Sequence, residues 1–185
     1  MFAPAPWLFG AMTLTFALAG PARAQRPPLD YLEGLPPLLD RDLFFGNPEI
    51  SGGQLSPDGR YVSFLKPLND VVNIWVKGID EPFEAARPVT ADSARPVTQY
   101  FWSEDSERIL YAQDKGGDEN YHVYAVDPDA APEAGSSVPP ALDLTPYESV
   151  QARIVAVPEN DPAHVILAIN DRDPALHDDY RVAND

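Results

Sequence analysis

The sequence predicts an all-β fold, a partial β-propeller, on three observations. A unit of short, alternating strand segments occurs twice, 47 residues apart, and each copy contains a Ser that lies two residues before an Asp. A period in the forties with four short strands per unit is typical of β-propellers, whose blades pack against their neighbours. Residues 49–185 hold about two and a half to three four-stranded blades, whereas a closed ring needs about four to eight.

Residues 1–24 predict a signal peptide. The run from Leu8 to Ala19 is largely apolar and too short to span a bilayer, and Ala22-Arg23-Ala24 has the small-x-small pattern of a cleavage site. No Lys or Arg precedes the apolar run, and a buried N-terminal helix is the alternative, although two Pro residues and a Gly disfavour it. We therefore expect an exported protein, periplasmic or secreted.

Residues 25–48 form a Pro-rich segment ahead of the repeats. Pro27-Pro28 and Pro36-Pro37 remove backbone donors and favour an extended chain. Asp40 is a suitable N-cap for one short helix that runs to Phe45. The incomplete propeller is therefore expected to occupy residues 49–185.

The first unit, about residues 49–95, contains a turn at Ser56-Pro57-Asp58-Gly59. Pro presets the backbone for a turn, Asp bonds a downstream amide, and Gly accepts a left-handed conformation. Tyr61 to Leu65 alternates as a half-buried strand does, and Asn73 to Asp80 reads as the next strand. Pro88-Val89-Thr90 completes the unit as a short last strand.

The second unit, about residues 96–148, aligns with the first by a shift of 47 residues without a gap. Two unrelated hairpins of equal length are the alternative, but the agreement extends over both strands and favours a repeat. A Pro-rich loop at 129–140 then leads to Leu142–Thr145, which echoes Pro88-Val89-Thr90. The aligned pairs are Ser56 and Ser103, Asp58 and Asp105, Val62 and Ile109, Asn73 and Asn120, and Val76 and Val123.

The third unit, about residues 149–185, follows the pattern more loosely. Arg153 to Val157 leads into a turn, His164 to Ile169 forms a strongly apolar strand, and Asp179 to Val182 begins the partner strand. We expect a truncated ring with open strand edges, which favours self-association through those edges.

Composition excludes several classes of function. The chain has 13 Lys and Arg against 29 Asp and Glu, and this excess of acid argues against a nucleic acid or a membrane as partner. The absence of Cys rules out disulfides and thiol chemistry. We predict no cofactor and no metal site. The spacing of the acidic cluster Asp171, Asp173, His177, Asp178 and Asp179 does not match an EF-hand, which favours a solvated loop over a Ca²⁺ site.

Two motifs resemble a known family. Asn47-Pro48-Glu49-Ile50 followed by Leu55 to Phe64 is similar to the opening blade of the prolyl oligopeptidase family. The run Gly116-Gly117-Asp118-Glu119-Asn120-Tyr121-His122 is more specific and resembles bacterial exported dipeptidyl-aminopeptidase and acylaminoacyl-peptidase-like members. The resemblance extends over about residues 38–185.

The resemblance implies an N-terminal propeller that filters the access of peptide substrates to a C-terminal α/β-hydrolase domain. Such a domain supplies a Ser–Asp–His triad, with the Ser in a Gly-x-Ser-x-Gly turn. The sequence contains no such pentapeptide, so we assign no catalytic residue and expect the chain alone to be inactive as a serine peptidase. The alternatives are a non-enzymatic periplasmic propeller-like interaction module and a nonfunctional gene fragment.

The resemblance also implies a substrate-binding residue. Exported aminopeptidases of this family can hold the free amine of a substrate with acidic propeller side chains, which makes Glu119, with its neighbour Asp118, the candidate. A carboxylate suits an ammonium group because their hydrogen bonds are charge-assisted. The alternative is that both acids only solvate a Gly-Gly turn.

Overall fold

The computed structural model describes residues 39–41 and 49–185. The predicted signal peptide and the helix expected from Asp40 to Phe45 lie outside the described residues, apart from residues 40 and 41. The chain divides into two units, Met1–Phe45 and Gly46–Asp185, and the strands of the described residues belong to the second. In the part of the chain that is described, no helix has the length and hydrophobicity needed to cross a membrane.

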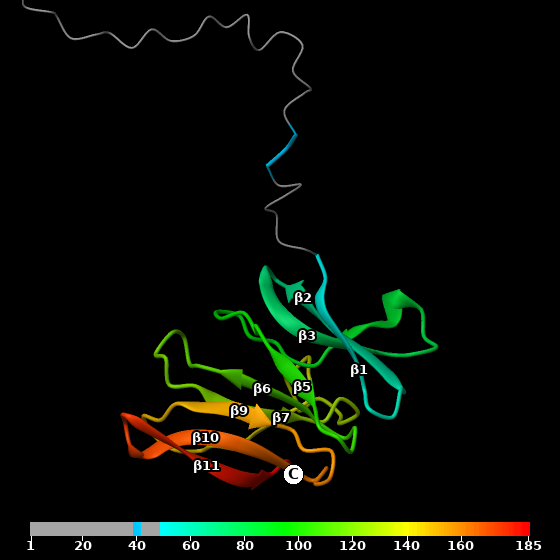
Figure 1. Ribbon diagram of the computed structural model, residues 1–185. Coiled ribbons are helices and arrows are strands. Elements are labelled where there is room, and N and C mark those ends of the chain that lie inside the picture. The colour runs from blue at the N-terminus through cyan, green and yellow to red at the C-terminus, as the bar shows by residue number, and fades with distance from the viewer. Residues whose placement is uncertain (1–38, 42–48) are drawn as a thin grey trace, which may run out of the picture. The chain divides into compact units, whose positions relative to one another are not determined.

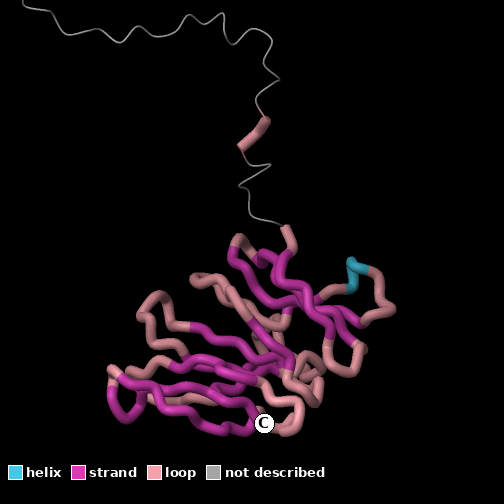
Figure 2. Tube along the Cα trace, viewed as in Figure 1, coloured by secondary structure: helices cyan, strands magenta, loops and turns pink. Residues whose placement is uncertain are grey.

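Three antiparallel sheets succeed one another along the chain, which confirms the all-β, partial-propeller prediction (Figure 1). The first and second sheets have four strands each in sequence order, and the third has three. One short 3₁₀ helix, Phe83–Ala85, interrupts the strands and loops of the described residues (Figure 2). The strands are β1 (Ser51–Leu55), β2 (Tyr61–Leu68), β3 (Val71–Gly78), β4 (Arg87–Pro88), β5 (Tyr100–Trp102), β6 (Ile109–Gln113), β7 (His122–Val126), β8 (Ala141–Asp143), β9 (Ala152–Ala156), β10 (His164–Asp173) and β11 (Leu176–Ala183).

The turn between the first two strands of a sheet is built in the same way in the first and second sheets. The Ser56 hydroxyl accepts the amide N–H of Tyr61 (3.0 Å), and the Ser56 carbonyl accepts that of Gly59 (2.8 Å). The Ser103 hydroxyl accepts the amide N–H of Arg108 (2.9 Å), as the 47-residue shift requires. The repeated Ser is therefore a structural residue that closes the turn.

The alignment of the first two units without a gap is wrong in the third strands of their sheets, β3 and β7. Leu65 pairs with Ile74, and Ala112, 47 residues after Leu65, pairs with Val123. The equivalent of Val123 is therefore Ile74 and not Val76, because the hairpin between β6 and β7 is two residues longer than that between β2 and β3. The amide N–H groups of Ile74 and Val123 also donate equivalent bonds, both 2.9 Å long, to the hydroxyls of Thr90 and Thr145.

The second sheet is covered on both faces. Side chains of a strand alternate between faces, so in β6 Ile109 packs into a core shared with the first sheet and Leu110 into a core shared with the third. The first core consists of Leu65, Ile74, Val76, Val89, Val97, Tyr100, Trp102, Ile109, Tyr111 and Val126. The second consists of Leu110, Val123, Ala125, Val150, Ala152, Val165, Leu167 and Ile169.

A buried polar contact joins the first two sheets. Ser63 of β2 is fully buried, and its hydroxyl accepts a hydrogen bond from the indole N–H of Trp102 (2.8 Å). The Tyr100 hydroxyl lies 2.9 Å from the same oxygen and 2.7 Å from the carbonyl of Gly52. This contact satisfies the polar atoms of two aromatic side chains inside an otherwise apolar core.

We predict that Ser63→Ala lowers the free energy of unfolding by about 1–3 kcal/mol, because it leaves the buried indole N–H of Trp102 without an acceptor. Urea denaturation followed by tryptophan fluorescence measures the change. Ser93→Ala, at an exposed position in the connection to the second sheet, is the matched control. Equal midpoints for the two variants would contradict the role assigned to Ser63.

Candidate functional site

The candidate residues Asp118 and Glu119 lie in the long hairpin between β6 and β7. Gly116 (φ 68°), Gly117 (φ 94°) and Glu119 (φ 61°) all have left-handed backbone conformations. Gly adopts this region freely, but a residue with a side chain does so at a cost and needs support from its surroundings. Asp114 supplies the support, since its carboxylate accepts the amide N–H of Glu119 (3.2 Å).

An ion pair between the buried Asp114 and the partly exposed Arg95 holds the base of this hairpin. The side chain of Asp114 is 1% exposed, and its second oxygen accepts a hydrogen bond from Arg95 Nε (3.0 Å). Arg95 comes from the connection between the first and second sheets, and its bond to Asp114 is the largest cause that raises its pKa. The conformation of Glu119 thus depends on a residue from outside its own hairpin.

The two candidate acids have different surroundings. The Asp118 carboxylate accepts the amide N–H groups of Lys115 (3.2 Å) and Asn120 (3.1 Å). The bond from the Asn120 amide is the largest cause that lowers the pKa of Asp118. Asp118 therefore orders the turn, which is the structural role left open as its alternative.

Glu119 has an exposed side chain whose carboxylate makes no hydrogen bond or ion pair with the described residues. Its backbone carbonyl accepts a hydrogen bond from Gln151 Nε2 (3.0 Å), just ahead of β9. The backbone of Glu119 is therefore attached to the third sheet while its carboxylate points to no protein partner. Of the two candidates, Glu119 has the acid available for a ligand.

Sequence reasoning missed a hollow of about 410 Å³ along the first strands of the three sheets. Leu55 of β1, Phe101 of β5 and Val155 of β9 line it, and Leu55 and Val155 are among the exposed large apolar residues. Leu55, Phe101 and Val155 are single apolar residues in three short strands. The sequence around them does not indicate that these strands are neighbours. Neither Asp118 nor Glu119 lines this hollow.

Three acids of the acidic cluster near the end of the sequence accept hydrogen bonds within the protein. Asp178 accepts two hydrogen bonds from Arg172 (2.6 and 2.8 Å). Asp171 accepts the Tyr180 hydroxyl (2.8 Å), and Asp173 accepts the amide N–H of Ala175 (2.9 Å). Within residues 39–41 and 49–185, no three His, Asp or Glu side chains are arranged to hold a metal ion.

We predict that Asp114→Asn loosens the hairpin and lowers the free energy of unfolding by about 1–3 kcal/mol. An amide in place of the carboxylate directs an N–H toward either Arg95 or the Glu119 amide, each of which is itself a donor. Hydrogen exchange at the Glu119 amide and urea denaturation measure the two effects. Glu119→Gln changes an exposed acid without a protein partner and is the control; a similar loss in both variants would contradict the assignment.

Comparison with known proteins gives two peptidase relatives. The chain is 41% identical over 174 residues to dipeptidyl aminopeptidase BIII of Pseudoxanthomonas mexicana, which covers 93% of this chain and 24% of that protein. It is 28% identical over 147 residues to dipeptidyl peptidase family member 6 of Caenorhabditis elegans, which covers 77% of this chain and 19% of that protein. The chain thus spans about a quarter or less of the length of these relatives.

The other two comparisons add less. No family model matches the chain. The crystal structure of TolB from Acinetobacter baumannii aligns with a TM-score of 0.40 at 18% identity, over 71% of this chain and 31% of that one. The 41% identity over nearly the whole chain, together with three successive antiparallel sheets, confirms the resemblance drawn from the motifs. The chain corresponds to the N-terminal propeller region of a peptidase family that includes these dipeptidyl peptidases.

Proposed function

We propose that this chain is the substrate-gating propeller portion of an exported serine peptidase that acts on peptides. The observation that carries the proposal is the 41% identity to a dipeptidyl aminopeptidase over 93% of the chain. The 185 residues contain no Gly-x-Ser-x-Gly turn, so the nucleophile belongs to an α/β-hydrolase domain outside this sequence. The propeller contributes to the reaction by admitting and orienting substrates.

The hollow along β1, β5 and β9 supports a gating role. It is lined by the first strand of each sheet, and in a propeller these strands lie nearest the central axis. Its exposed apolar side chains offer a surface on which the side chains of an extended peptide lose contact with water. A passage of this kind selects peptides by width and by apolar character.

Glu119 supports recognition of a free amine. Its carboxylate is exposed and has no partner in the described residues, while its backbone is held by Asp114 and Gln151. A positioned carboxylate binds an ammonium group through charge-assisted hydrogen bonds. Release of a dipeptide requires that the amino terminus be held at a fixed distance from the nucleophile, and a single anchored acid supplies such a reference point.

Export is part of the proposal. The apolar run and the small-x-small pattern in residues 1–24 support a signal peptide. A chain without Cys folds without a disulfide, so its stability depends on the two apolar cores. Cell fractionation of an epitope-tagged full-length chain tests this part of the proposal.

The gating role predicts that residues 49–185 function in place of the part of the Pseudoxanthomonas enzyme that aligns with them. A chimera of this kind should release dipeptides from dipeptidyl p-nitroanilides. Introducing Glu119→Gln should raise KM for these free-amine substrates about tenfold or more, because a charge-assisted hydrogen bond is lost. The same substitution should leave KM for N-acetylated peptides unchanged.

Two controls complete this experiment. Glu107→Gln alters an exposed acid in the turn between β5 and β6, at the other end of the second sheet, and should change neither KM. A fluorophosphonate label on the nucleophile shows that the hydrolase domain of the chimera has folded. A labelled chimera that releases no dipeptide would refute the gating role, and an equal rise in KM for free and acetylated substrates would refute the role of Glu119.

A further inference from the structure

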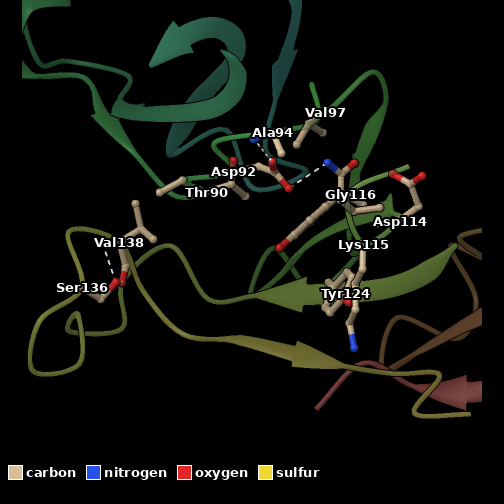
Figure 3. A pocket seen from close by; sticks show the side chains of 13 residues that line it. Thr90, Asp92, Ala94, Val97, Asp114, Lys115, Gly116, Tyr124, Ser136 and Val138 are labelled. Carbon is tan, nitrogen blue, oxygen red and sulfur yellow. Dashed lines mark hydrogen bonds between the residues drawn. The ribbon is translucent and has the colours of Figure 1, made fainter. Parts of the chain in front are cut away.

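A second cavity, of about 430 Å³, lies between the connection from the first to the second sheet and the β6–β7 hairpin (Figure 3). Asp92 and Val97 of the connection line one side, and Gln113 and Lys115 line another. The loop between β7 and β8 adds Ser136 and Val138. Glu119 does not line this cavity, and no residue of the hollow along β1, β5 and β9 does, so the site is separate from both features of the proposed function.

Two tyrosines form part of the cavity wall. Tyr111 of β6 and Tyr124 of β7 are cross-strand partners, and their rings stack with centroids 5.4 Å apart. Tyr111 is 9% exposed, and both side chains line the cavity. Neither hydroxyl makes a hydrogen bond with the described residues.

The Tyr111 hydroxyl is accessible through this cavity. Among the described residues, every fully buried polar side-chain atom has a hydrogen-bond partner, so an oxygen without one must be in reach of solvent. Tyr111 is otherwise enclosed in the core between the first two sheets, and the cavity is the space that it lines. A nearly buried side chain thus presents an unused polar atom to a hollow in the protein.

The charges around the two tyrosines are mainly negative. Burial is the largest cause that raises the pKa of both phenols, and the carboxylates of Asp92 and Asp143 raise both pKa values further. Asp92 also lines the cavity. Its carboxylate accepts hydrogen bonds from Gln113 Nε2 (3.0 Å) and from the amide N–H groups of Ala94 (2.8 Å) and Arg95 (2.7 Å), which fix its position while it keeps its negative charge. Lys115 is the one Lys or Arg in the cavity wall, and its side chain is exposed. Asp114 also lines the cavity, but its charge is paired with that of Arg95.

We propose that this cavity binds a primary ammonium group. The Tyr111 and Tyr124 hydroxyls accept hydrogen bonds from it, since a phenol oxygen is an acceptor as well as a donor. Aromatic faces attract cations, and the Asp92 carboxylate balances the charge. An anion would face the Asp92 carboxylate and the negative potential of Asp143, which disfavours carboxylate and phosphate ligands. The proposal does not depend on the peptidase role.

Tyrosine NMR of the full-length chain tests the proposal directly. The chain is prepared with ¹³C-labelled tyrosine rings and titrated with n-butylammonium chloride at constant ionic strength. We expect saturable shifts of the Tyr111 and Tyr124 resonances, assigned with Tyr→Phe variants, and no such shifts with sodium butyrate. Absence of saturation, or equal shifts with butyrate, would overturn the proposal.

Variants identify the groups that bind the ligand. Tyr111→Phe keeps the ring and removes the hydroxyl, and we expect it to weaken n-butylammonium binding about tenfold. Lys115→Gln, which removes a competing cation, should strengthen binding. Tyr61→Phe removes a phenol that is already hydrogen-bonded to Asp129 and should have no effect. Unchanged binding in folded Tyr111→Phe would refute the site.

Two further measurements identify the source of the amine and test whether the cavity is independent of Glu119. Alanyl-alanine amide and its N-acetylated form are tested as competitors of n-butylammonium. Competition by the free peptide alone assigns the site to peptide amino termini. Competition by neither peptide assigns it to small free amines. Glu119→Gln should leave all of these affinities unchanged. A parallel loss in Glu119→Gln would overturn the claim that the cavity is a separate site.

Discussion

The structure depends on the burial of both faces of the second sheet. Its strands supply Ile109 and Val126 to one core and Leu110 and Val123 to the other, so this sheet is stable only when both neighbours are in place. Burial of apolar area is the main favourable contribution to such packing, and it is not directional. Polar contacts are directional. The hydrogen bond between Trp102 and Ser63 therefore fixes how the first two sheets are positioned against each other.

The difference between the hairpins explains where the sites occur. The β2–β3 hairpin turns tightly through Asn69 and Asp70, both at positive φ, as hairpin turns prefer. The β6–β7 hairpin is two residues longer and contains Asp118 and Glu119. Packing determines the strands, which therefore repeat, whereas a surface hairpin tolerates insertion. The longer hairpin brings acidic side chains to the surface without disturbing either core.

The sequence predicted correctly the features that depend on residues close together in the chain, such as the turns. The Ser56 turn follows from Pro, Asp and Gly at fixed positions, and the structure shows the same turn at Ser103. The alignment of Val76 with Val123 failed, because Val residues at a constant spacing agree by chance once a hairpin changes in length. The tyrosine cavity was beyond sequence reasoning, since Asp92 reaches Tyr111 and Tyr124 only through the packing of a connection on a hairpin. Pairing across strands and sheets determines such a site, and no local pattern records it.

Charge by itself does not identify a binding residue in this chain. Most of the acids described above already accept hydrogen bonds within the protein: Asp114 from Arg95, Asp118 from two backbone amides, and Asp178 from Arg172. Replacing such a partner with a ligand returns little free energy, because one hydrogen bond is exchanged for another. A group without a protein partner exchanges only water for the ligand, so no contact within the protein is lost when the ligand binds. The free Glu119 carboxylate and the free hydroxyls of Tyr111 and Tyr124 are therefore stronger indications of binding than the net charge of −16.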